Sequence, residues 1–204
     1  MGYSTDFEGR FSITPALRPE HAAYLARFCT TRRMKRDEGI TARFPDPERE
    51  AVGLPVGVEG GFYVGSAGLA QETRNSAKDW RNFGVLDPSQ PPKGQPSLCC
   101  QWIPNQAGTA LEWDQIEKFY GYQEWLQYLI DSFLQPWRYT VAGRVTWQGE
   151  DEDDFGILEV ANHVVRAEFG HTRPSPEMPP ADTMTRSDPS LIARIFGRWK
   201  RRKP

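Results

Sequence analysis

Apolar and polar residues alternate along the first segment of the chain, residues 3–13. A period of two is typical of a β-strand with one face against a core. The residues of the expected inner face are Tyr3, Thr5, Phe7, Phe11 and Ile13. This segment is therefore predicted to form a half-buried strand.

A helical spacing follows over residues 19–34, after Pro15 and Pro19. Its apolar stripe consists of Tyr24, Leu25, Phe28 and Cys29. The pattern ends in the basic run 32–36, and cations at a helix C-terminus complement the helix dipole. The run is accordingly interpreted as a solvated helix end.

Residues 37–96 have no sustained period. They contain seven prolines and nine glycines, and one short apolar piece at 62–64. The segment is predicted to be a long irregular insertion with at most one strand, and long loops of this kind often carry function.

Ordered patterns resume at residue 98. Residues 98–103 and 109–113 flank the turn sequence 105–108 and predict a hairpin. Asp114 and Glu117 fit a capping box, which predicts a helix that ends at Pro136. The apolar positions of this helix are Phe119, Tyr122, Leu126, Leu129, Ile130 and Phe133.

Three further strands are predicted after that helix. Residues 139–147 alternate, and residues 157–160 and 164–168 flank Asn162 and His163. Asn accepts a positive φ, so this dipeptide is predicted to form a tight turn.

The resulting order β–α–(insertion)–β–β–α–β–β–β predicts an α+β fold. Its first six elements match a ferredoxin-like split βαβ sandwich, with two helices on one face of an antiparallel sheet. The last two strands would extend the sheet as a C-terminal β-meander. The expected organisation is one domain over 1–169 with the 37–96 insertion, a proline-rich flexible linker over 170–186, and a helix over 187–204.

Composition favours a folded protein of a reducing compartment. The chain has 204 residues, 38% of them hydrophobic, and 3 cysteines without metal-ligand spacing. No apolar run approaches the ~20 residues of a membrane span. The protein is therefore expected to be cytoplasmic.

The net charge of −2 conceals a basic C-terminus, since residues 189–204 carry no acid. The predicted helix there has an apolar face and a basic face, which suits docking to an acidic protein surface, in cis or in trans. Anionic membrane or nucleic acid phosphates are less favoured alternatives. The proposed docking residues are Arg194, Phe196, Arg198, Trp199, Lys200, Arg201, Arg202 and Lys203.

Five consecutive carboxylates at 150–154 follow the strand ending near Trp147. They spread around the backbone instead of converging, so the favoured interpretation is a solvated turn with no metal site. Weak binding of a divalent cation or of a basic partner is the alternative. An aromatic-walled ligand pocket is a second hypothesis, against the simpler reading that these tryptophans belong to the core. Its candidate residues are Trp102, Glu112, Trp113, Trp147 and Glu150.

Several pieces of the chain resemble a family of uncharacterised bacterial proteins, associated with bacterial genomes and their mobile elements. The resemblance spans residues 2–165 and implies no activity, so no catalytic residue follows from it. The pieces are GYSTDFEGRF, YLARFCTTRRMKRD, GQPSLCCQW, EWDQIEKFYGYQEWLQYLIDSFLQPWRY and GRVTWQGEDEDDFGILEVANHVV.

The sequence contains no catalytic motif and implies no cofactor. It favours a non-enzymatic binding or interaction protein that acts through a protein partner, self-association or a small ligand. The alternative is an enzyme with a carboxylate- or cysteine-based site formed by the sheet and the insertion. An enzyme should bring perturbed titratable groups together beside the insertion, whereas a binding module should expose apolar side chains.

Overall fold

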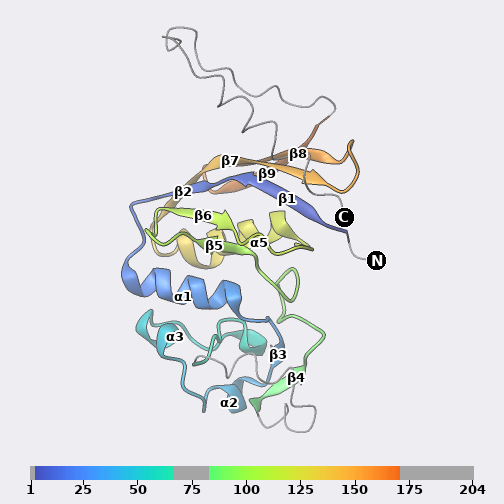
Figure 1. The fold of residues 1–204 in the computed structure, drawn as a ribbon. Helices are drawn as coiled ribbons and strands as arrows, with labels where there is room; N and C mark the ends of the chain where they lie inside the picture. The colour runs from blue at the N-terminus through green and yellow to red at the C-terminus, as the bar shows by residue number, and fades with distance from the viewer. Residues whose placement is uncertain (1–2, 67–82, 171–204) are drawn as a thin grey trace. The chain divides into compact units, whose positions relative to one another are not determined.

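A computed structural model describes residues 3–66 and 83–170, which lie within one compact unit, Met1–Thr172. Its main element is a seven-stranded antiparallel sheet in the order β5–β6–β2–β7–β8–β9, with β1 also paired to β7 (Figure 1). The strands are β1 (Thr5–Gly9), β2 (Phe11–Thr14), β5 (Trp102–Pro104), β6 (Ala110–Trp113), β7 (Thr140–Gly149), β8 (Phe155–Ala161) and β9 (Val164–Phe169).

The first two strands continue one another along β7. Both pair with β7 in the same register, and only Arg10 separates them. Gly9 (φ 115°) and Gly143 (φ 146°) lie at the junction between β1 and β2 along β7. A Cβ on Gly9 would lie 2.9 Å from the carbonyl oxygen of Arg144. The predicted inner face is confirmed for Thr5, Phe7, Phe11 and Ile13, whereas Tyr3 is exposed. A bend at the glycines lets β2 also reach β6.

Two helices cover one face of the sheet (Figure 1). They are α1 (Pro19–Thr30), which contacts β5, and α5 (Tyr122–Leu129), which contacts β5 and β9 and continues as the π-helix η3 (Ile130–Leu134). The predicted apolar stripe of α1 is confirmed, because each of its members is buried. The buried side chains of the two helices are His21, Tyr24, Leu25, Phe28, Cys29, Trp125, Leu126 and Leu129.

The predicted start of the second helix is wrong. Asp114 does not cap it; its carboxylate accepts a hydrogen bond from the Ile116 amide at 2.9 Å. Gln115 and Lys118 have φ values of 65° and 67°, which interrupt any helix there. A local side-chain-to-backbone hydrogen bond has replaced the helical one, as Asp side chains often allow. The helix begins only at Tyr122.

The predicted end of the first helix is also wrong. The helix stops at Thr30, and Lys35–Arg36 forms the short strand β3, paired with β4 (Val85–Asp87). Arg33 and Arg36 are only 2% and 3% exposed. The basic run therefore turns inward after the helix and is not a solvated helix end.

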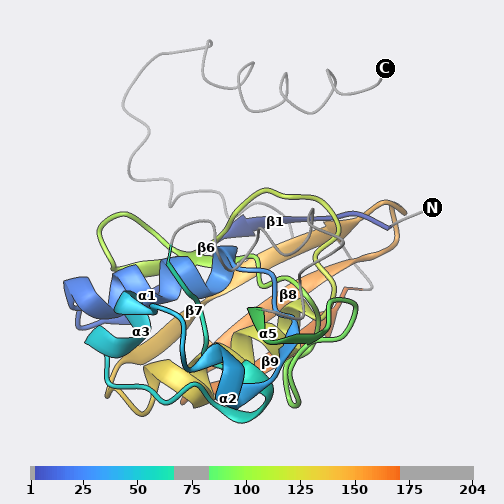
Figure 2. The ribbon, with the colours of Figure 1, turned by 90° about the horizontal axis from the view of Figure 1, so that it is seen from below.

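The described parts of the insertion form a layer beneath α1, on the side away from the large sheet (Figures 1 and 2). This layer contains β3, β4, α2 (Glu38–Thr41), α3 (Pro47–Ala51) and the 3₁₀ turn η1 (Val58–Gly60). The one strand predicted for the insertion is β4, at Val85–Asp87. The apolar piece 62–64 is irregular, with Tyr63 and Val64 buried. The insertion is more structured than its proline and glycine content predicts.

Both predicted hairpins are present, but the first strand of the first one begins at Trp102 and not at residue 98. The β5–β6 turn is organised by Asn105, whose side-chain oxygen accepts from the amides of Thr109 at 2.9 Å and Ala110 at 3.3 Å. The β8–β9 turn consists of Asn162 and His163, with φ values of 52° and 64°. Two successive positive φ values are typical of the tight turn that matches strand twist. This turn places β9 antiparallel beside β8, which forms the predicted C-terminal β-meander.

Candidate functional site

The three predicted pocket tryptophans lie around Phe7. The ring of Phe7 meets those of Trp102 and Trp113 edge-on, at centroid distances of 5.2 and 5.5 Å. Trp102 is fully buried and donates its indole N–H to the Tyr122 carbonyl at 2.8 Å. Trp147 is 3% exposed and contacts the Tyr122 ring at 6.0 Å. These rings therefore form one end of the core.

The two predicted pocket glutamates lie elsewhere. Glu112 alternates with Trp113 along β6, so it faces the opposite side of the sheet, where its carboxylate lies 3.9 Å from Arg10. Glu150 follows β7 and accepts from the amide of Ser4 at 2.8 Å. The structure thus gathers the tryptophans without the glutamates.

The acidic run forms the β7–β8 connection. The amide of Gly149 donates to the Asp154 carbonyl at 2.7 Å, and Asp151, Glu152 and Asp153 are exposed. Tyr3 donates its hydroxyl hydrogen bond to the Asp154 carboxylate. Within residues 3–66 and 83–170, no three His, Cys, Asp or Glu side chains lie together in a way that could hold a metal ion.

A buried arginine organises the insertion. Arg33 donates to the carbonyls of Gly61 and Tyr63, both at 2.9 Å, and to the Gln95 side-chain oxygen at 3.2 Å. Its guanidinium lies 4.2 Å above the Phe28 ring centroid. Burial lowers the pKa of Arg33. The fork geometry of an arginine suits this task, because one side chain fixes several acceptors at once.

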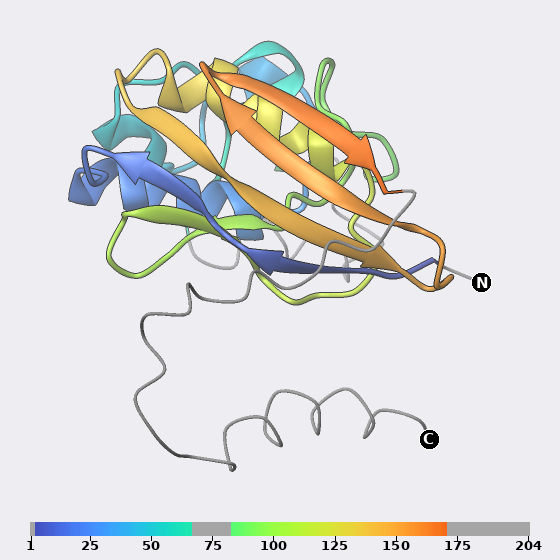
Figure 3. The same cartoon turned by 90° about the horizontal axis from the view of Figure 1, so that it is seen from above.

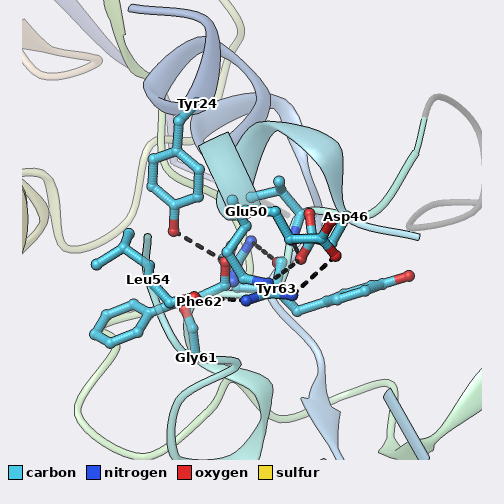
Figure 4. A network of polar contacts seen from close by, with 10 residues as sticks. Tyr24, Asp46, Glu50, Leu54, Gly61, Phe62 and Tyr63 are labelled. Carbon is cyan, nitrogen blue, oxygen red and sulfur yellow. Dashed lines mark hydrogen bonds and ion pairs between the residues drawn. The ribbon is translucent and has the colours of Figure 1, made fainter. Parts of the chain in front are cut away.

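A buried carboxylate holds the same segment from the other side (Figure 4). Asp46 is fully buried, and its Oδ2 accepts from Arg49 at 2.7 Å and from the Val64 amide at 3.2 Å. Its Oδ1 has no hydrogen-bond partner among the described residues. Burial raises the pKa of Asp46. Tyr24 also donates to the Phe62 carbonyl at 2.9 Å, so the segment is fixed by three side chains.

Perturbed titratable groups therefore do converge beside the insertion, as the enzyme hypothesis requires, but they are enclosed. Arg33 and Asp46 are at most 2% exposed, and each binds backbone of the insertion. Cys29 is buried, and burial together with the adjacent Cys100 thiol raises its pKa, which disfavours the reactive thiolate. These groups stabilise the insertion and offer no open reaction centre.

Among the described residues, β9 is the last strand and its outer backbone edge, at one end of the sheet, pairs with no other strand (Figure 3). Gly170, just after the strand, donates its amide to the carbonyl of Phe155 in β8 at 2.9 Å, whereas Val165 donates its amide to Gln127 on α5. Backbone groups of successive strand residues alternate sides. Arg166 and Glu168 therefore face β8, and Val165, Ala167 and Phe169 face outward.

Among the described residues, only side chains at the beginning of this edge cover it. Gln127 accepts from the Val165 amide and donates to the His163 carbonyl, both at 2.9 Å. Within the described part of the chain, the backbone groups of Ala167 and Phe169 that face outward have no hydrogen-bond partner. Phe169 is 67% exposed although its ring contacts Trp147 at 5.5 Å. An open edge flanked by an exposed aromatic ring is a template for another strand.

Sequence reasoning missed Arg33, Asp46, Gln127 and Ala167 as residues with a role. For Ala167 the sequence did contain an indication, because the last strand of a meander lies at an edge of the sheet unless another strand follows it.

Comparisons of the chain with protein-family models, with curated proteins and with solved structures find no match. The predicted C-terminal helix over 187–204, with its docking residues Arg194 to Lys203, lies outside the described residues. No helix within the described ranges is long and apolar enough to cross a membrane.

Proposed function

We propose that this protein is a non-enzymatic interaction module that binds an extended segment of a protein partner along β9. The observation that carries this proposal is the outward backbone of Ala167 and Phe169, unpaired among the described residues, beside the exposed Phe169 ring. Strand addition gives affinity through main-chain hydrogen bonds and specificity through alternate side chains.

The fold that supports this surface is inferred to be a ferredoxin-like split βαβ sandwich extended at one edge. The order β5–β6–β2–β7, with α1 between β2 and β5 and α5 between β6 and β7, supports this inference. The strands β8 and β9 then extend the sheet beyond β7. Membership of the bacterial family that the sequence resembles stays an expectation.

A small ligand at the aromatic end of the core is a second candidate function. Its support is the indole N–H of Trp147, which is buried and has no acceptor among the described residues. Buried donors normally have a partner, so a ligand acceptor at this point would satisfy it. Tryptophan emission of the parent and of Trp147→Phe, titrated with small aromatic acids, tests this: a saturable change in the parent alone is expected, and identical responses contradict it.

Strand addition is tested by selecting displayed decapeptides on the full chain alone and then measuring the binding of the selected peptides to Ala167→Pro. Proline removes the outward N–H without touching the β8 ladder, so edge strands tolerate it. Ala167→Ser, which keeps the N–H, is the matched control. Selected peptides should bind the parent and the serine variant but not the proline variant.

A readout in the parent protein removes dependence on the folding of any variant. Bound peptide should slow amide exchange at Ala167 and Phe169, and leave Arg166, which already pairs with β8, unchanged. Peptides that bind the proline variant equally well, or that protect no β9 amide, would overturn the proposal.

A further inference from the structure

The sequence of β9 is self-complementary about Ala167. If two copies of the strand run antiparallel with Ala167 opposite Ala167, then Arg166 of each copy faces Glu168 of the other. Val165 then faces Phe169 on the opposite surface of the sheet. Opposite charges and apolar pairs placed directly across two strands stabilise the pairing.

The outward backbone groups match the same alignment. In an antiparallel pair, directly opposed residues whose groups face each other exchange both N–H···O bonds. Ala167 would make this exchange with Ala167 of the second copy. The Phe169 amide would donate to the Val165 carbonyl, which is free to accept because Gln127 uses only the Val165 amide.

On the sheet face that the helices do not cover, alternating charges would continue from β9 onto the β9 strand of the second copy. Arg144 on β7 lies 3.0 Å from Glu159 on β8, and Glu159 is opposite Arg166 on β9. The row thus reads positive, negative, positive towards the edge. Glu168 of the second copy extends the alternation by one more negative charge, where any like charge would be repelled.

The apolar residues on the opposite face of β9 fit the same antiparallel alignment. Phe169 is opposite Gly156 on β8, and Gly156 leaves room for the Trp147 ring beside it. Val165 is only 7% exposed, whereas Phe169 is 67% exposed. In the two-fold pair, Val165 of the second copy covers part of the exposed Phe169 ring.

We propose that the partner of the β9 edge is a second copy of this chain, joined antiparallel about a two-fold axis at Ala167. This inference rests on the proposed function and names the partner of the same edge. A two-fold contact uses the same patch on both copies, so one self-complementary strand is sufficient. Gln127 limits the pairing at Val165, so the contact is short and the dimer reversible.

Sedimentation velocity of the full chain over a wide concentration range tests the proposal. The parent is expected to form a dimer at high concentration. Arg166→Glu and Glu168→Arg each place like charges opposite one another, and each should weaken the homodimer by roughly tenfold or more. An equimolar mixture restores both opposite-charge pairs and should form a heterodimer with affinity near that of the parent.

The mixture separates an effect on association from an effect on folding. Any folding defect of a variant persists in the mixed sample, so recovery of binding there comes from the charge pairs between the two chains. Ala167→Pro should also be monomeric, with Ala167→Ser as its control. A parent that stays monomeric at every concentration overturns the second-copy partner, as does a mixture that does not associate or single variants that dimerise like the parent. The peptide selection on β9 is independent of these results and tests the edge itself.

Discussion

The side-chain amide of Gln127 binds the backbone of Val165 as a neighbouring strand would. Its oxygen accepts from the Val165 amide at 2.9 Å, and its nitrogen donates to the His163 carbonyl at 2.9 Å. A helix side chain thus closes the first part of the β9 edge. The edge beyond it, at Ala167 and Phe169, is the part left for a partner strand.

Gln127→Ala is expected to destabilise the fold by about 1–2 kcal/mol, because two backbone groups lose their partner. It also frees the Val165 amide to pair with Phe169 of a second copy, so self-association should become tighter. Urea unfolding measures the first effect and sedimentation measures the second.

Gln123→Ala is the matched control for this substitution. Gln123 lies on the same helix and makes neither contact, so its replacement should change stability by no more than about 0.5 kcal/mol. Equal effects of the two alanine variants on stability and association would contradict the role of Gln127 at the edge.

Gly156→Ala is expected to cost about 3 kcal/mol through overpacking. A Cβ there would lie 2.3 Å from the Glu168 carbonyl oxygen and 2.7 Å from the Trp147 ring. The free energy of unfolding from urea titration is the measurement. Gly39→Ala, with 3.5 Å to its nearest neighbour, should be neutral or stabilising; a tolerated alanine at 156 would contradict the described packing of Trp147.

Arg33→Lys is expected to destabilise the protein by about 3 kcal/mol, because a lysine ammonium cannot reach the three acceptors of the guanidinium fork. Protease cleavage within residues 57–66 should accelerate. Arg32→Lys is the control: the neighbouring arginine donates to the Pro88 carbonyl at 3.2 Å and is half-buried, so a change within about 0.5 kcal/mol is expected. Similar losses in both variants would contradict the network.

Asp46 gives a prediction for pH. Because burial raises its pKa above the ordinary 3.8, the folded state holds this proton to higher pH than the unfolded chain does. Its contribution to stability is therefore greatest below 3.8 and falls as pH rises through the raised pKa. The parent should lose stability relative to Asp46→Asn over that interval, measured by urea unfolding at successive pH values. A constant difference, or one that grows in favour of the parent, would contradict a raised pKa.

The strands and the two sheet-covering helices could be predicted because one face of each is buried, which imposes a period. Asn162 and His163 marked their turn for a local reason, since few residues accept these backbone angles. Asn105 marked the other turn because its side chain can bind the backbone of the turn. The Asp114 turn was missed because the same side chain can cap a helix or fold back on its own backbone. Nothing local distinguished the two outcomes.

The insertion and the edge depend on contacts that are distant along the chain. In the sequence Arg33 is one member of a basic run, and its role depends on Gly61, Tyr63 and Gln95, which are distant along the chain. In the sequence Gln127 is one polar position of a helix, and its role depends on its hydrogen bonds to His163 and Val165 at the start of β9. The structure places the three tryptophans at one end of the core, but the alternation of β6 separates Glu112 from them, as the sequence of that strand already implied.

Amide hydrogen exchange at Ala167 tests the central claim most directly, because this N–H faces outward from β9 and belongs to the proposed contact. Measured by NMR on the full chain at low and high concentration, its exchange should slow markedly as concentration rises. The amides of Arg166 and Glu168, which pair with β8, should stay protected throughout. An Ala167 amide that exchanges equally fast at every concentration and with every selected peptide would contradict the account of β9 as a binding edge.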